Sequence, residues 1–248
     1  MKRLQIYILG VGLALLSACS SQQNISNIQT HKNIVIDSNI GDDATFDQVI
    51  APYKSELEKQ MNIKISHTSV ELNKTGDNSN LGNLLTDYTY EGALAWAKTN
   101  NIPSIDGAVI NIGGIRTIIP AGDITIKQIF EVMPFENEVV IVKIKGSDLQ
   151  GLFDYYLKEK TNNPVSHITI LTEGNQIKTA LISGQKIDKD KTYYIATSDY
   201  LAMGGDRMYF FGKGEMIGTG IKLRELFIEK FKENKEVKVP TDLRLDLK

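Results

Sequence analysis

The sequence predicts an α+β fold in which a mixed β-sheet packs with helices. Helical apolar stripes and strand-like runs occupy most of the chain, and several strand-like runs follow one another without an intervening helix. Strands that follow one another without a helix between them favour a mixed sheet over a doubly wound parallel sheet. The 248 residues, of which 42% are hydrophobic and 23% charged, are enough to bury a substantial core.

The first 19 residues differ from the rest. Lys2 and Arg3 precede an apolar run that is too short to span a bilayer comfortably, and small residues lead to Cys19, the only cysteine. The stretch is typical of a secretory signal, and "LSAC" resembles the lipobox of bacterial lipoproteins, in which the cysteine is lipidated. The alternative is a chance leader on a cytosolic chain.

The next segment, residues 20–32, is polar and lacks any apolar period, which predicts a flexible tether. We therefore expect a lipoprotein signal peptide over 1–19, a tether over 20–32 and one domain over 33–248. This organisation predicts a lipid anchor in the cell envelope, at the outer membrane or the periplasmic face of a bacterial membrane.

The first half of the expected domain begins with "NIVID" at 33–37, a short strand-like run. Apolar residues at helical spacing predict a helix over 43–61, and "IKISHTSVEL" at 63–72 predicts another strand. Ser79 or Asn80 can cap a helix that ends near residues 100–101, because leucines recur at positions 81, 84 and 85.

The second half begins with a buried strand at 106–112, followed by a short helix over 125–132 and a strand over 137–146. Ser147 with Gln150 has the spacing of a capping box for the next helix. The remaining elements are strands at 167–171, 177–183 and 192–198, and a last helix that carries Leu223, Leu226, Phe227 and Phe231.

Catalytic and metal-binding motifs are missing from the sequence. The three histidines have no DxH, HExxH or GNH spacing, and His67 and His167 are interpreted as strand residues. There is no serine nucleophile elbow and no phosphate loop. We therefore expect no catalytic residue, no metal site and no cofactor bound by this chain.

The charge balance argues against nucleic-acid binding. Without Lys2 and Arg3 the chain carries 26 basic and 30 acidic residues. Nucleic-acid-binding proteins depend on clustered basic residues that neutralise phosphates. A small-molecule ligand is the better expectation.

Two glycine pairs suggest where such a ligand binds. Gly113-Gly114 follows a buried strand and precedes Arg116, and a second pair precedes Asp206. Paired glycines allow a tight turn and close approach of a ligand, and a guanidinium can hold an anionic or hydroxyl-rich group. The alternatives are a simple turn with a solvated arginine, a turn aspartate, and a Phe135 that only packs in the core.

Four blocks in order resemble the C-terminal domain of the 5′-nucleotidase family, which includes periplasmic UDP-sugar hydrolases and ecto-5′-nucleotidases. They are "SNLGNLLTD", "NIGGIR", "GDITIKQIFEVMPFENEVVIVKIKGSDL" and "TYYIATSDYLAMGGD", and the resemblance runs from about residue 63 to 231. It implies a 5′-nucleotidase C-terminal-domain-like α+β fold that holds the nucleoside part of a nucleotide.

The resemblance also implies roles for individual residues. Phe135 and Tyr200 would clamp the base, and Asp206 would contact ribose hydroxyls. The other contacts would come from Asn111, Arg116 and Asn137. Gly204 and Gly205 would clear room for the sugar, and the backbone at Gly113 would let the ligand approach closely. Base–aromatic stacking contributes about 1–3 kcal/mol per base and tolerates different bases, so two rings suit broad specificity.

The sequence departs from the family pattern in four places. The family's catalytic metallophosphatase domain precedes this one, whereas about 60 residues separate Cys19 from "SNLGNL". Thr75, beside Lys74, stands near the place of a common family arginine, and Arg207 replaces the last glycine of GGDG. "TNNPV" stands where relatives are glycine-rich.

These features predict the substrate-binding half of a split 5′-nucleotidase, inactive alone. It would hydrolyse nucleotide phosphate esters with a separate metallophosphatase chain that carries the divalent metals. The alternatives are a non-catalytic lipoprotein that binds nucleotides or nucleosides at the membrane, and a structural lipoprotein with a vestigial site.

Overall fold

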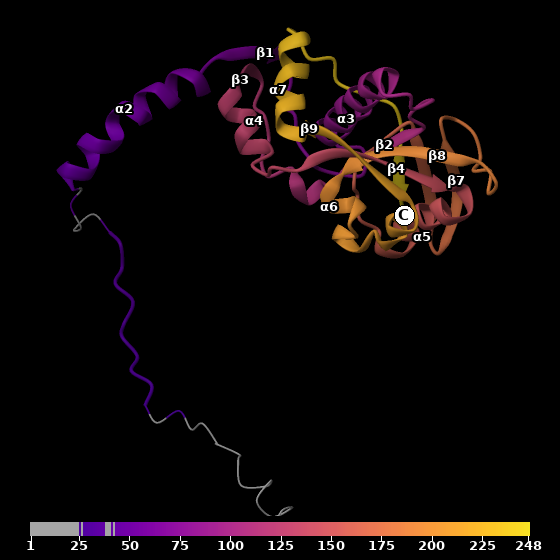
Figure 1. The fold of residues 1–248 in the computed structure, drawn as a ribbon, viewed down its shortest axis with the longest axis horizontal. Coiled ribbons are helices and arrows are strands. Elements are labelled where there is room, and N and C mark those ends of the chain that lie inside the picture. The colour runs from indigo at the N-terminus through magenta and orange to yellow at the C-terminus, as the bar shows by residue number, and fades with distance from the viewer. Residues whose placement is uncertain (1–24, 26, 38–40, 42) are drawn as a thin grey trace, which may run out of the picture. The chain divides into compact units, whose positions relative to one another are not determined.

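The computed structural model describes residues 25, 27–37, 41 and 43–248 (Figure 1). The chain separates into two units, residues 1–49 and 50–248, and the fold below is that of the second. The predicted signal peptide at 1–19 and its Cys19 lie outside the described residues. Residues 25 and 27–32 of the predicted tether are exposed and have no regular secondary structure. The predicted domain boundaries therefore stay a prediction.

A five-stranded sheet forms the centre of the second unit, in the order β5-β2-β8-β4-β9. β2 and β8 run parallel, and the other neighbouring pairs run antiparallel. The sheet is therefore mixed, which confirms the α+β prediction. The strands are β5 (Val165–Ser166), β2 (Gly107–Val109), β8 (Thr192–Ser198), β4 (Glu138–Lys145) and β9 (Glu215–Lys222).

Both faces of this sheet are buried. Successive side chains of a strand point to opposite faces, so neighbouring residues of one strand belong to different cores. On β4, Val139 and Ile141 belong to one buried cluster and Val140 and Val142 to another. The first cluster packs against α3 (Asn80–Thr99), α4 (Ile126–Val132) and α7 (Leu223–Glu233). The second packs against α5 (Gly146–Glu159), on the other side of the sheet (Figure 1).

Two smaller sheets complete the fold. A three-stranded sheet has the order β10-β6-β7, with β10 (Leu245–Leu247) parallel to β6 (Ile168–Glu173) and β7 (Gln176–Ile182) antiparallel to it. β1 (Lys64–Thr68) pairs antiparallel with β3 (Gly122–Thr125).

Most predicted helices are confirmed: α2 (Ala44–Met61), α3, α4 and α7 lie where the apolar spacing placed them. Ile50 and Leu57 of α2 are exposed. No described helix is both long and apolar enough to cross a bilayer.

The predicted Ser147–Gln150 capping box is wrong, because α5 already begins at Gly146. The N–H groups of Gly146 and Ser147 donate to the carbonyls of Lys191 and Lys189. These backbone acceptors satisfy donors that a side-chain cap would otherwise satisfy.

The strand prediction at 33–37 is wrong, whereas the strand predicted at 167–171 is confirmed as β6 except for its first residue. Residues 33–37 have no regular secondary structure and are exposed, because β propensity alone does not make a strand. His167 precedes β6 and has a left-handed backbone, with φ of 59°. Its ring stacks on Tyr90, with centroids 3.8 Å apart.

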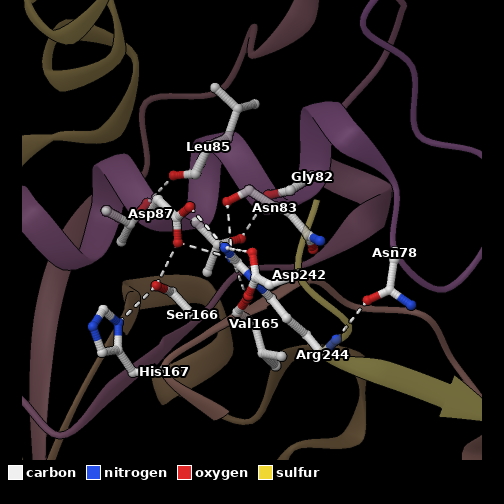
Figure 2. A network of polar contacts seen from close by, with 12 residues as sticks. Asn78, Gly82, Asn83, Leu85, Asp87, Val165, Ser166, His167, Asp242 and Arg244 are labelled. Atoms are coloured by element: carbon white, nitrogen blue, oxygen red, sulfur yellow. Dashed lines mark hydrogen bonds and ion pairs between the residues drawn. The ribbon is translucent and has the colours of Figure 1, made fainter. Parts of the chain in front are cut away.

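A buried guanidinium ties the C-terminal segment to the body of the unit (Figure 2). Arg244 is 6% exposed, and both terminal nitrogens donate to the two carboxylate oxygens of Asp87 on α3, each at 2.8 Å. It also donates to the Val165 carbonyl and to Asp242. One side chain thus joins α3, β5 and the segment that leads into β10.

We expect Arg244→Ala to lower the free energy of unfolding by about 3–5 kcal/mol, because it leaves the Asp87 carboxylate without its buried partner. Urea denaturation followed by circular dichroism measures the change. Lys178→Ala, which breaks an exposed pair with Glu173, should cost no more than about 1 kcal/mol. Equal losses in the two variants would contradict a central role for Arg244.

Candidate functional site

Strand direction brings three loops to one end of the central sheet. Because β2 and β8 are parallel, the segments that follow them leave the same edge. β4 runs antiparallel to β8, with Val139 opposite Ser198, so the residues just before β4 reach that edge as well. The loops at 110–116, 133–137 and 199–207 therefore meet.

A cavity of about 360 Å³ lies where these loops meet. Seven of the eight predicted substrate-binding residues line it. They are Asn111, Gly113, Arg116, Phe135, Asn137, Tyr200 and Asp206. Gly204 does not line the cavity; its φ of 92° places it in the left-handed backbone region that favours glycine.

The first loop is a turn of 3₁₀ helix, η1 (Ile112–Gly114), that follows β2. A Cβ at Gly114 would come within 3.0 Å of the Asn111 side-chain oxygen, so this glycine leaves room for the asparagine. Arg116 donates to the Gly113 carbonyl at 3.2 Å, and its guanidinium lies 5.9 Å from the centre of the Phe135 ring.

Asn163 anchors this turn and was missed from the sequence. Its side-chain oxygen accepts from the Ile112 N–H at 2.8 Å, and its amide nitrogen donates to the Tyr155 hydroxyl at 3.1 Å. It is fully buried. Asn163 belongs to the "TNNPV" segment, which is interpreted from the sequence as a departure from a glycine-rich family pattern, and this is the only sequence signal for it.

The loop after β8 begins with a short helix, α6 (Asp199–Ala202), capped by the Ser198 hydroxyl, which accepts from the Leu201 N–H. A Cβ at Gly205 would lie 2.6 Å from both the Tyr200 ring and the Tyr200 carbonyl. The expectation that the glycines of this pair clear room for a sugar is therefore wrong for Gly205. It makes room for the tyrosine of its own loop.

Tyr200 also fixes the carboxylate of Asp206. The tyrosine hydroxyl donates to Asp206 Oδ1 at 2.7 Å and accepts from the Asp206 N–H at 3.3 Å. The hydrogen bond to Asp206 raises the pKa of Tyr200 above its ordinary value of 10.0. The second carboxylate oxygen, Oδ2, has no protein partner among the described residues.

The two predicted clamp rings are both available to a ligand. Phe135 and Tyr200 are each 41% exposed, although large aromatic side chains usually bury most of their surface. Each lines the cavity, and within the described residues neither ring contacts the other. Phe135 is therefore not a core residue.

Lys74, Thr75 and Arg207, which are interpreted as departures from the family pattern, lie around the cavity and do not line it. Lys74 donates to the Ile115 carbonyl at 2.6 Å and so supports the first loop, while the Thr75 N–H donates to Asn73. Arg207 lines a neighbouring cavity and pairs with Glu159. Among the residues that the structure describes, no three His, Cys, Asp or Glu side chains are grouped to hold a metal ion.

Comparison with known proteins shows the family of the chain. The profile of the family described as "5′-nucleotidase, C-terminal domain" matches residues 58–213, and the chain belongs to this family. It is 28% identical to Protein UshA of Yersinia enterocolitica over 181 residues, and 27% identical to a 5′-nucleotidase of Vibrio vulnificus over 224 residues. These alignments cover 71% and 84% of this chain but 32% and 38% of those proteins.

The fold is shared with solved structures. A 5′-nucleotidase precursor from Thermus thermophilus aligns with a TM-score of 0.66 at 24% identity, over 81% of this chain and 42% of that one. The NAD nucleotidase of Haemophilus influenzae aligns with a TM-score of 0.61 at 22% identity, over 83% of this chain and 42% of that one.

We expect Gly205→Ala to lower the free energy of unfolding by about 1–3 kcal/mol, because the new methyl group overlaps the Tyr200 ring and carbonyl. Thermal and urea unfolding measure the change. Gly212→Ala is the matched control, since a Cβ there meets nothing within 4 Å. A Gly205 variant as stable as the Gly212 variant would show that the Tyr200 ring has other room to occupy.

Proposed function

We propose that this domain binds the nucleoside part of a nucleotide and acts with a separate metallophosphatase chain in the hydrolysis of 5′-nucleotide phosphate esters. The observation that carries the proposal is the cavity at the loop edge, where two exposed rings, a positioned carboxylate and two amides come together. Family membership supports the assignment to nucleotide catabolism.

The cavity offers each part of a nucleoside a matching surface. Phe135 and Tyr200 present π faces for a flat heterocycle, and Arg116 lies over Phe135 within cation–π range. Asn111 and Asn137 can donate to and accept from the edge of a base. Asp206, held by the Tyr200 hydroxyl, can accept hydrogen bonds from pentose hydroxyls through Oδ2.

In this proposal the chain's own residues bind and orient, and the partner carries out the bond cleavage. Divalent metals on the partner would polarise the phosphate and activate a water molecule. The residues described here would hold the nucleoside, so that the 5′ phosphate projects from the cavity toward the partner. The proposal includes the lipid anchor at Cys19, which would keep the complex at a membrane of the cell envelope.

We expect calorimetry with adenosine to show binding that falls about 5- to 150-fold in Phe135→Ala and again in Tyr200→Ala, because each ring contributes about 1–3 kcal/mol of stacking. Tyr53→Ala, which removes an exposed ring from α2, should leave the dissociation constant unchanged. Undiminished binding in the double Phe135→Ala, Tyr200→Ala variant would rule out the stacking slot.

The partnership has its own test. The purified chain, mixed with metallophosphatase chains from neighbouring genes and a divalent metal, should release phosphate from AMP faster than either chain alone. Asp206→Asn should reduce this gain, because the uncharged amide is a weaker acceptor for pentose hydroxyls. Binding of AMP without a faster release in any mixture would favour a tethered binding lipoprotein instead.

A further inference from the structure

The loop that carries Asp206 has an unfavourable backbone. Asp206 has φ of 49° and Arg207 has φ of 68°, so two successive residues with side chains adopt the left-handed conformation. Each such residue costs about 1–2 kcal/mol relative to the right-handed region. Strain of this kind persists only where surrounding contacts hold the backbone in place, and it gathers at functional sites.

Among the described residues, two side-chain contacts hold residues 206–207, and they reach different elements. Asp206 is bonded to Tyr200 within the same loop. Arg207 reaches out of the loop and donates to Glu159 Oε2 at 2.9 Å, at the last residue of α5. The Glu159 side chain is 18% exposed, whereas Arg207 is 70% exposed, so the glutamate is the fixed partner of this pair.

The pair lies beside the nucleoside cavity. A second cavity, of about 370 Å³, is lined by Glu159, Arg207 and Tyr155 together with Gly113 and Asp206. The last two residues also line the first cavity, so Asp206 forms part of the wall between them. The ion pair therefore supports the carboxylate from the side that faces away from the two rings.

We propose that the Glu159–Arg207 ion pair positions Asp206 and thereby sets the preference of the site for a pentose that keeps its hydroxyls. The inference rests on the function proposed above. The tyrosine orients the carboxylate within the loop, and the ion pair fixes the loop to α5. Without the pair, the strained backbone at 206–207 can relax, and Asp206 moves away from the hydroxyls while the rings stay in place.

The test compares adenosine with 2′,3′-dideoxyadenosine by calorimetry on the full chain. Glu159→Gln removes the ion pair without touching the loop backbone. An exposed or half-buried pair contributes up to about 1 kcal/mol, which is about a fivefold change in affinity. We expect adenosine to bind two- to fivefold more weakly, and the dissociation constant of dideoxyadenosine to stay the same.

Three further variants separate positioning from stability. Arg207→Lys keeps a cation within reach of Glu159 and should retain most of the preference for adenosine. Arg207→Gly also removes the pair, but glycine suits the left-handed backbone and relieves the strain at 207, so this variant should stay folded and retain more of the preference than Glu159→Gln. Glu173→Gln breaks an ion pair with Lys178 in the three-stranded sheet and should change neither dissociation constant.

Each remaining outcome overturns the inference. Equal weakening of both nucleosides in Glu159→Gln would show a general structural effect, and unchanged binding of both would show that the pair does not act on Asp206. A wild-type chain that binds dideoxyadenosine as tightly as adenosine would refute the hydroxyl preference while leaving base binding intact. Failure of the wild-type chain to bind either nucleoside would refute the proposed function itself.

Discussion

The site depends on the pairing of β8 with its two neighbours in the central sheet. The parallel β2–β8 pair sends two loops out of one edge, and the antiparallel β4–β8 pair returns a third segment to it. Residues 111, 135 and 200 are far apart in the chain and meet only through this arrangement. Helices on both faces bury the sheet, so the edge is the part of it that can meet a ligand.

Several residues around the cavity stabilise the loops of the protein itself and do not depend on a ligand. Gly205 accommodates the Tyr200 ring, Gly114 accommodates Asn111, and Asn163 satisfies the N–H of Ile112. The first two contacts reduce the freedom of residues that line the cavity, and the third holds the turn between Asn111 and Gly113. A preorganised site loses less conformational entropy on binding, so contacts of modest strength can yield useful affinity.

The sequence alone supported the fold class, the family and most residues of the cavity, since these follow from apolar periodicity and from short motifs that occur in the family's order along the chain. What it missed depends on contacts between distant segments. Asn163 has its role only because it accepts from the Ile112 N–H. β9 contains two glycines and alternates weakly between apolar and polar residues, and it forms because it pairs with β4. Residues 33–37 show the converse, a strand-like pattern that forms no regular structure. Ser147 is not needed as a cap, because the first N–H groups of α5 donate to two carbonyls more than 40 residues away.

The two rings of the cavity stand at the ends of adjacent antiparallel strands, Phe135 shortly before β4 and Tyr200 shortly after β8. Strand pairing advances in whole residues, and a slip by one residue would turn every buried side chain of β4 to the opposite face. Changes in the sheet therefore cannot gradually adjust the width of the proposed slot between the rings. New ligand preferences in this lineage must arise by exchanging the ring types themselves or by reshaping the loops that bear them.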